Sequence, residues 1–219
     1  MNGAMVQPPR KQENVKLASD LARQDFAGKD LRDAAAKTGA ELQGDGSLSV
    51  RFLNETYVVR CAKKREVVKE NGEPAGDRMA ALVLHYLTRG DGTPPTGKEI
   101  GFAQIPGAGF YEGPFRKRIV SRVSRKFGGD PSLLLKCGLD LGGRKAKYGD
   151  AAMTFDVFPR VAVAIVVWRG DNEFPANANF VFDASIANYL AVEDVVVACE
   201  EIVNRLSKAA SSMSGESKK

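Results

Sequence analysis

One uninterrupted apolar run, VAVAIVVW at residues 161–168, constrains the fold of this chain more than any other stretch. Eight residues are too few to cross a bilayer, and a strand with apolar residues on both faces needs cover on both faces. We therefore expect a central strand in the interior of the protein. The segment NANFVFD at residues 177–183 alternates apolar and polar residues, and we expect it to pair with this strand across the loop RGDNEFPA.

Helical periodicity and capping residues predict several helices. They cover residues 14–26, 31–38, 77–89, 114–127, 132–141 and 192–208. The alternating segments LSVRFL and TYVVRC, joined by Asn54-Glu55, predict an antiparallel hairpin, and a further strand is expected at residues 66–68. Helices and strands come in blocks without regular alternation, which is typical of an α+β fold with antiparallel hairpins. We expect a single domain at residues 13–210, a flexible arm at 1–12 and a disordered tail at 211–219.

The composition suits one globular domain, because 43% of the 219 residues are hydrophobic and 27% are charged. The N-terminal residues MNGAMVQPPRKQ hold no apolar stretch, so we expect a cytoplasmic protein that does not bind a membrane. Cys61, Cys137 and Cys199 are odd in number and widely spaced, which excludes a disulfide framework and a Cys-x-x-Cys motif. The net charge of +5 favours anionic partners without indicating nucleic acid.

The stretch GTPPTGK at residues 92–98 resembles a nucleotide-binding P-loop, with two spaced glycines before a lysine. A P-loop wraps phosphates in consecutive backbone N–H groups and holds magnesium with a Ser or Thr after the lysine. Here Pro94 and Pro95 remove two of these donors, and Glu99 stands where the hydroxyl residue should be. We therefore expect no nucleotide to bind through residues 92–98, and we interpret the stretch as a stiff connector.

His85 is the only histidine, so it alone offers a neutral nitrogen ligand or a proton shuttle near neutral pH. A multi-histidine metal site is excluded, and no nucleophile motif accompanies His85. One interpretation is a hydrogen-bonded histidine at the edge of a core helix. The other is an axial metal ligand, because a cofactor that carries its own metal needs only one such ligand from the protein.

The segment FRKRIVSRVSRKF at residues 115–127 has six basic residues and no acidic one. Helical spacing puts Arg118, Arg122, Arg125 and Lys126 on one side and apolar residues on another. This basic stripe is either a solvated face or a site for the carboxylates or phosphates of an anionic ligand. The chain lacks an RNA-binding aromatic signature, so nucleic-acid binding through residues 116–126 is kept only as a further alternative.

Catalytic residues do not assemble from the sequence, because no nucleophile, base and oxyanion donors stand in a known spacing. This disfavours an enzyme. Acidic residues near the 161–183 hairpin, Asp171 and Asp183 among them, are typical of turns. Tyr111 and Phe174 stand in loops containing glycine or proline, where binding residues are often displayed, although loop aromatics also plug small satellite cores.

Three motifs are distinctive: RFLNETYVV, then LHYLTRGDGTPPTGKEIGFAQIPGAGFY with FRKR, and WRGDNEFPANANFVFDASIANYL followed by ED. Over about residues 14–207 they resemble an uncharacterised family, a domain of unknown function found mainly in anaerobic bacteria and methanogenic archaea. Members of that family are often fused to a small four-cysteine iron–sulfur domain similar to that of corrinoid iron–sulfur proteins. The resemblance implies low-potential redox or corrinoid chemistry. The arm of this chain has no cysteine, so an iron–sulfur partner would be a separate protein.

Six residues fall on the motifs that carry this resemblance, none with a role that can be transferred. They are His85, Tyr111, Arg116, Arg118, Asn179 and Asp183. Together with Phe174 they form the expected cofactor-binding set. We expect a cytoplasmic binding protein for an anionic, metal-containing tetrapyrrole, a corrinoid or haem, with His85 as metal ligand and residues 116–118 meeting its carboxylates. The alternative is an accessory protein that docks on a redox enzyme or iron–sulfur carrier and has no ligand of its own.

Overall fold

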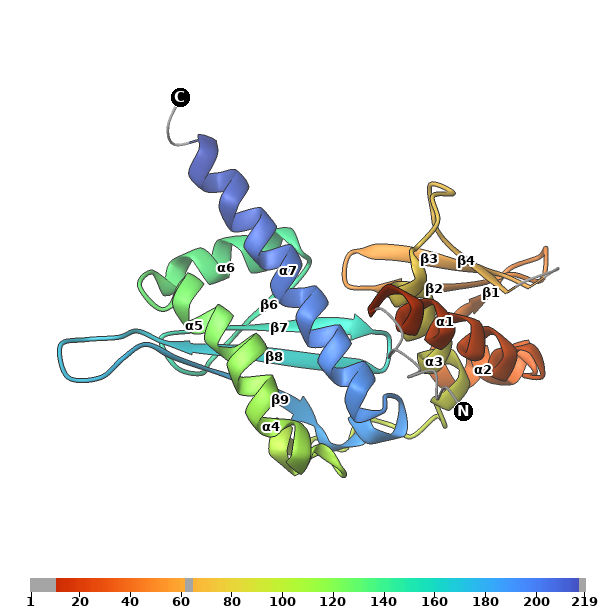
Figure 1. Cartoon of the computed structure of the whole chain (residues 1–219), viewed down its shortest axis with the longest axis horizontal. Helices are drawn as coiled ribbons and strands as arrows, with labels where there is room; N and C mark the ends of the chain where they lie inside the picture. The colour runs from red at the N-terminus through yellow and green to blue at the C-terminus, as the bar shows by residue number, and fades with distance from the viewer. Residues whose placement is uncertain (1–10, 62–64, 217–219) are drawn as a thin grey trace, which may run out of the picture.

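The apolar run at residues 161–168 forms the middle strand of an antiparallel sheet (Figure 1). The computed structural model describes residues 11–61 and 65–216, and within them this sheet has five strands. In spatial order they are β5 (Glu99–Gly101), β9 (Asn177–Asp183), β8 (Val161–Trp168), β7 (Ala151–Phe158) and β6 (Arg144–Ala146). β8 pairs with β9 on one side and with β7 on the other. The predicted central strand and its partner are therefore confirmed.

Helices cover one face of this sheet, as Figure 1 shows. They are α4 (Glu112–Phe115), the π-helical turn η3 (Arg116–Val120), α5 (Ser121–Phe127), α6 (Pro131–Asp140) and α7 (Val192–Glu216). Val163, Ile165 and Phe180 are buried on this face, because side chains alternate between the two faces of a strand. The opposite face bears small residues, among them Ala162 and Ala164, beside an open pocket of about 500 Å³. Helices cover only one face, yet β8 is buried on both as expected, because Ala164 and Val166 on the opposite face are buried too.

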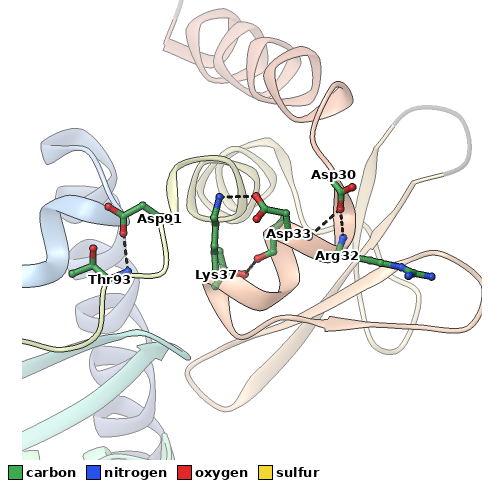
Figure 2. Close-up of polar contacts among 8 residues, drawn as sticks. Asp30, Arg32, Asp33, Lys37, Asp91 and Thr93 are labelled. Atoms are coloured by element: carbon green, nitrogen blue, oxygen red, sulfur yellow. Dashed lines mark hydrogen bonds and ion pairs between the residues drawn. The ribbon is translucent and has the colours of Figure 1, made fainter.

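The N-terminal half folds around a second antiparallel sheet, in the order β1-β2-β3-β4. Its elements are α1 (Lys11–Ala27), α2 (Leu31–Thr38), β1 (Glu41–Leu42), β2 (Leu48–Phe52), β3 (Glu55–Arg60), β4 (Glu66–Lys69) and α3 (Asp77–Arg89). Asp30 caps α2 by accepting hydrogen bonds from the backbone N–H groups of Arg32 and Asp33, as Figure 2 shows. Two antiparallel sheets packed with helices confirm the α+β class.

The β2–β3 hairpin turns one residue earlier than the sequence predicts. Phe52 pairs with Glu55, so Leu53 and Asn54 form the turn and Glu55 belongs to β3. Leu53 has a left-handed backbone with φ of 55°, which leucine rarely adopts. Its side chain is buried, and its N–H donates to the carbonyl oxygen of Val157 in β7. Contact between the two sheets therefore fixes this turn, which local sequence does not show.

Tyr86 of α3 joins the two halves of the chain. Its ring stacks on Phe158 of β7 with centroids 4.0 Å apart, and Phe158 meets Phe52 of β2 edge-on. The buried Tyr86 hydroxyl donates to the carbonyl oxygen of Thr38 and accepts from the backbone N–H of Arg160. The buried residues of both sheets form one continuous core, which confirms a single domain.

The C-terminal helix is longer than expected. α7 continues to Glu216, past the predicted end at Lys208 and into the segment expected to be a tail. Leu206 and Ala210 are fully buried at helical spacing, and this packing extends the helix. At the other end α1 begins at Lys11, and residues 1–10 of the expected arm lie outside the described residues.

The glycine- and proline-rich segment 90–113, which includes the connector at residues 92–98, contains short regular elements. It contains β5 and two short 3₁₀ turns, η1 (Phe102–Gln104) and η2 (Ala108–Tyr111). Within residues 11–61 and 65–216, no helix is long and apolar enough to cross a bilayer.

Replacing Tyr86 by Phe keeps the ring packing but removes the hydroxyl shared by Thr38 and Arg160. We expect the free energy of unfolding to fall by about 1–3 kcal/mol, the cost of leaving buried polar groups unpaired. Urea unfolding followed by circular dichroism measures this loss. Tyr148→Phe is the matched control, because its hydroxyl bonds Glu99 at the surface and its removal should cost less than about 0.5 kcal/mol. Equal losses in the two variants would contradict the role of Tyr86.

Candidate functional site

The residues predicted to bind a cofactor do not meet in one place. His85 lines one pocket, whereas Tyr111 and Arg118 line another. The first turn of α7 contributes to both, with Asp194 in the first pocket and Glu193 in the second. The two pockets are therefore described separately.

His85 is held by a carboxylate from α7. Its Nδ1 atom lies 2.8 Å from Oδ1 of Asp194, and the two side chains are 31% and 10% exposed. This hydrogen bond raises the pKa of His85 and outweighs the opposing effect of burial. The ionised carboxylate accepts the Nδ1 proton, so the Nε2 atom carries the lone pair whenever the ring is neutral.

The pocket beside His85, called the His85 pocket below, is open and has a volume of about 450 Å³. Its other lining residues are Asp25, Lys29, Thr88, Arg89, Ala191 and Asp194. Nε2 of His85 has no hydrogen-bond partner in the part of the chain that the structure describes. The hydroxyl of Thr88 is buried and also lacks a described partner, which is uncommon in proteins. His85 is therefore the lining residue that offers a nitrogen lone pair to a bound molecule.

The second pocket lies between the α4–η3 helix and α7 and has a volume of about 210 Å³; it is called the α4–α7 pocket below. Its apolar lining consists of Pro114, Phe115, Ile119, Val196 and Val197. Its polar lining consists of Arg78, Tyr111, Arg118 and Glu193. The Tyr111 hydroxyl donates to Oε1 of Glu193, and this bond raises the pKa of Tyr111.

Glu200 lies next to the α4–α7 pocket and joins two arginines from distant parts of the chain. Arg118 of η3 donates to its Oε1 at 2.8 Å, and Arg78 of α3 donates to its Oε2. The Glu200 side chain is only 10% exposed. Burial favours its neutral form, but the two guanidinium groups outweigh burial, so the pKa of Glu200 lies below its usual value.

The basic stripe is divided between protein contacts and solvent. Besides the Arg118 contact, Arg122 donates to the side-chain oxygen of Asn204 on α7 at 2.8 Å. Arg116 is exposed and makes no ion pair or hydrogen bond with any described side chain. Two residues of the stripe thus hold α7, which the sequence did not reveal.

Asp183 organises the connector that resembles a P-loop. Its carboxylate accepts hydrogen bonds from the N–H and hydroxyl of Thr96, the N–H of Gly97 and the N–H of Ser185. Burial raises the pKa of Asp183, but these bonds outweigh burial and hold the pKa far below its usual value. The start of the connector is held by Asp91, which accepts the N–H of Thr93 (Figure 2). The N–H groups of this near-motif therefore bind a carboxylate of the same chain.

Phe174 and Asn179 lie away from both pockets. Phe174 is 68% exposed in the β8–β9 loop, where the Asp171 carboxylate accepts its backbone N–H. Asn179 pairs with Val166, on the face of the sheet opposite the buried Phe180. Neither residue joins His85 or Arg118.

The residues that the sequence reading missed are mostly partners of those it found. Asp194, Glu200 and Thr88 shape the two pockets, and Lys29 and Arg89 flank His85. Glu193 and Asp194 stand in the first turn of a predicted helix, where acidic residues are common, so the sequence did not single them out. Glu200 carried no signal of its own.

Asp183→Asn should lower the free energy of unfolding by about 1–3 kcal/mol near neutral pH, because its charge strengthens the hydrogen bonds from Thr96, Gly97 and Ser185. The folded-state pKa of Asp183 lies below the usual aspartate value of about 4, so this stabilisation is present above that pH and is lost as pH falls toward the folded pKa. Unfolding titrations should therefore show the gap between wild type and variant closing below about pH 4. The control is Asp171→Asn, whose carboxylate bonds only its own loop. A gap that does not change with pH would contradict this account.

Comparison with known proteins gives a family but no relative of known activity. No curated protein and no solved structure matches the chain. The family model described as "Domain of unknown function (DUF3786)" matches residues 30–205, from the start of α2 to α7. The match covers most of the chain, and the expected resemblance to an uncharacterised family is confirmed, while the fusion to an iron–sulfur domain stays a prediction. The chain belongs to the domain-of-unknown-function family DUF3786.

Proposed function

We propose that this protein binds an anionic, metal-containing tetrapyrrole, a corrinoid or haem, with His85 as the axial ligand. The supporting observation is the hydrogen bond between Nδ1 of His85 and Asp194, which leaves Nε2 without a described partner on a side chain that lines an open pocket. Metal-binding histidines commonly donate their second ring N–H to a carboxylate, which fixes the ring and raises its basicity.

A tetrapyrrole suits a pocket with one nitrogen ligand. Such a cofactor supplies the other metal ligands itself, so a single histidine suffices. Among residues 11–61 and 65–216, no group of three or more His, Cys, Asp or Glu side chains is arranged to hold a bare metal ion. His85 is therefore suited to act as the one protein ligand of a metal that a cofactor already holds.

Two of the four charged residues that line the His85 pocket are basic and would meet the carboxylates of a tetrapyrrole, and the other two are Asp25 and Asp194. Lys29 and Arg89 line the His85 pocket, and they replace the 116–118 cluster in this role because Arg118 lines the α4–α7 pocket. The pocket is open, so one face of the cofactor would remain accessible to a separate partner, such as an iron–sulfur or corrinoid protein.

Titration of the purified protein with hydroxocobalamin and with haemin, followed by visible absorption, tests the proposal. We expect a spectral shift in the wild type and none in His85→Ala, because the axial nitrogen is lost. Asp194→Asn should weaken binding about 10- to 100-fold, as loss of a group that orients a metal ligand does. Arg116→Gln is the control and should bind like the wild type, since Arg116 lies outside the His85 pocket.

Two outcomes would count against this function. If neither compound shifts its spectrum or co-elutes with the folded protein, tetrapyrrole binding is wrong. If His85→Ala shifts the spectrum as the wild type does, binding stands but His85 is not the ligand. Thermal melts of each variant show that it is folded.

A docking protein without its own ligand is the second candidate, favoured by two exposed aromatic side chains. Phe110 is 96% exposed and Phe174 is 68% exposed, and large exposed apolar groups often mark interaction sites. Hydrogen bonds from the backbone of Glu173 and Phe174 to Asp171 order the Phe174 loop, which lowers the entropic cost of binding.

This candidate predicts that the wild-type protein, recovered from an anaerobic lysate, carries a redox enzyme or iron–sulfur carrier in a one-to-one ratio. No chromophore should be bound to this chain. Phe174→Ala should reduce recovery at least about tenfold, the effect of losing a buried aromatic anchor. Glu173→Gln, an exposed neighbour, is the control. Undiminished recovery with Phe174→Ala would exclude docking through this loop.

A further inference from the structure

The α4–α7 pocket has no role in the proposed function. Its walls come from the α4–η3 helix on one side and from α7 on the other, and His85 is not among its lining residues. Phe115 in its wall is buried and stacks on Phe102, with ring centroids 3.8 Å apart, so this wall is firmly supported. The turn η3, which supplies Arg118 and Ile119, is π-helical, a geometry that recurs at functional sites.

Along α7, the pocket is bordered first by an acidic side chain and then by two valines, and the next residue on this face is the glutamate that the two arginines bind. Glu193, Val196 with Val197, and Glu200 follow at intervals of three or four residues, so they share one face. Glu193 and Glu200 are seven residues apart, which is two turns or about 10 Å along the axis. The pocket is therefore apolar in the middle and polar at both ends.

The end near Glu200 is able to hold an anion. Arg78 and Arg118 share the single carboxylate of Glu200, so this group of three carries one excess positive charge. Their side chains are 39% and 59% exposed, and each bonds Glu200 through one terminal nitrogen only, which leaves further N–H donors unused by described residues. Guanidinium donors of this kind are suited to carboxylates.

The end near Glu193 is less repulsive to an anion than its charge implies. The Tyr111 hydroxyl donates to Glu193, and Glu193 is two helical turns from Glu200. A ligand whose carboxylate is held by Arg78 and Arg118 therefore keeps its negative charge away from Glu193, and its hydrocarbon stem lies next to Val196 and Val197. The volume of about 210 Å³ is below the roughly 300–1,000 Å³ of pockets for drug-sized ligands, so the stem must be short.

We propose that the α4–α7 pocket binds a short-chain aliphatic carboxylate, with its carboxylate on Arg78 and Arg118 and its hydrocarbon stem against Ile119, Val196 and Val197. This site is separate from the His85 pocket and would hold a different class of ligand. It does not depend on tetrapyrrole binding, and either proposal can fail without the other.

Hexanoate is the probe, and hexan-1-ol and hexylamine have the same chain with a neutral and a cationic head. Titration of ¹⁵N-labelled protein by NMR should show saturable shifts at residues around Ile119 and Val197 with hexanoate. Binding of the other two compounds should be at least about tenfold weaker, since each lacks charge-assisted hydrogen bonds to the arginines. Tighter binding of hexylamine or hexan-1-ol than of hexanoate would overturn the proposal, as would the absence of saturable shifts with hexanoate.

Two variants test the two parts of the pocket. Arg118→Gln should weaken hexanoate binding about tenfold, whereas Arg125→Gln on the next helix, which bonds only the carbonyl oxygen of Ser121, should leave it unchanged. Val197→Phe fills the space for the stem and should abolish binding while the protein stays folded by its NMR spectrum. His85→Ala should bind hexanoate as the wild type does. Unchanged hexanoate affinity in both Arg118→Gln and Val197→Phe would refute this assignment.

Discussion

The carboxylate of Glu200 is the group on which the arrangement of the candidate sites depends most. A nearly buried charge is costly unless it is paired, and Glu200 is paired with one arginine from α3 and one from η3. These contacts fix α7 against both the N-terminal half of the chain and the helix that covers the five-stranded sheet. Asp194 and Glu193 add a contact to His85 and one to Tyr111 from the same helix. Acidic residues of α7 therefore determine where both pockets lie.

Sequence patterns predicted those elements whose signal is local. The run VAVAIVVW gave β8, and Asp30 with Gly39 marked both ends of α2, because burial on two faces and helix capping leave traces in consecutive residues. The strands β1, β5 and β6 are two or three residues long, too short for alternation to show. The turn at Leu53 was misplaced because a contact with Val157, far along the chain, decides it.

The candidate site was predictable only where one residue type was rare. His85 was found because it is the only histidine, whereas its partner Asp194 is 109 residues away and resembles any acid in a first helical turn. Arg118 was recognised as part of a basic stripe, but its partner Glu200 lies 82 residues further on. Which charged side chains meet is decided by tertiary packing, so Tyr111 and His85 could be expected together and yet line different pockets.

The helix α3 has a mechanical role that follows from the spacing of its residues. Arg78 and His85 are seven positions apart, so two turns of one helix carry a residue of each pocket, and Tyr86 next to His85 anchors the same helix in the core. α7 spans the same two pockets on the opposing side. Sliding or rotation of α3 against α7 would thus change both volumes at once. The two helices therefore give both pockets a shared wall.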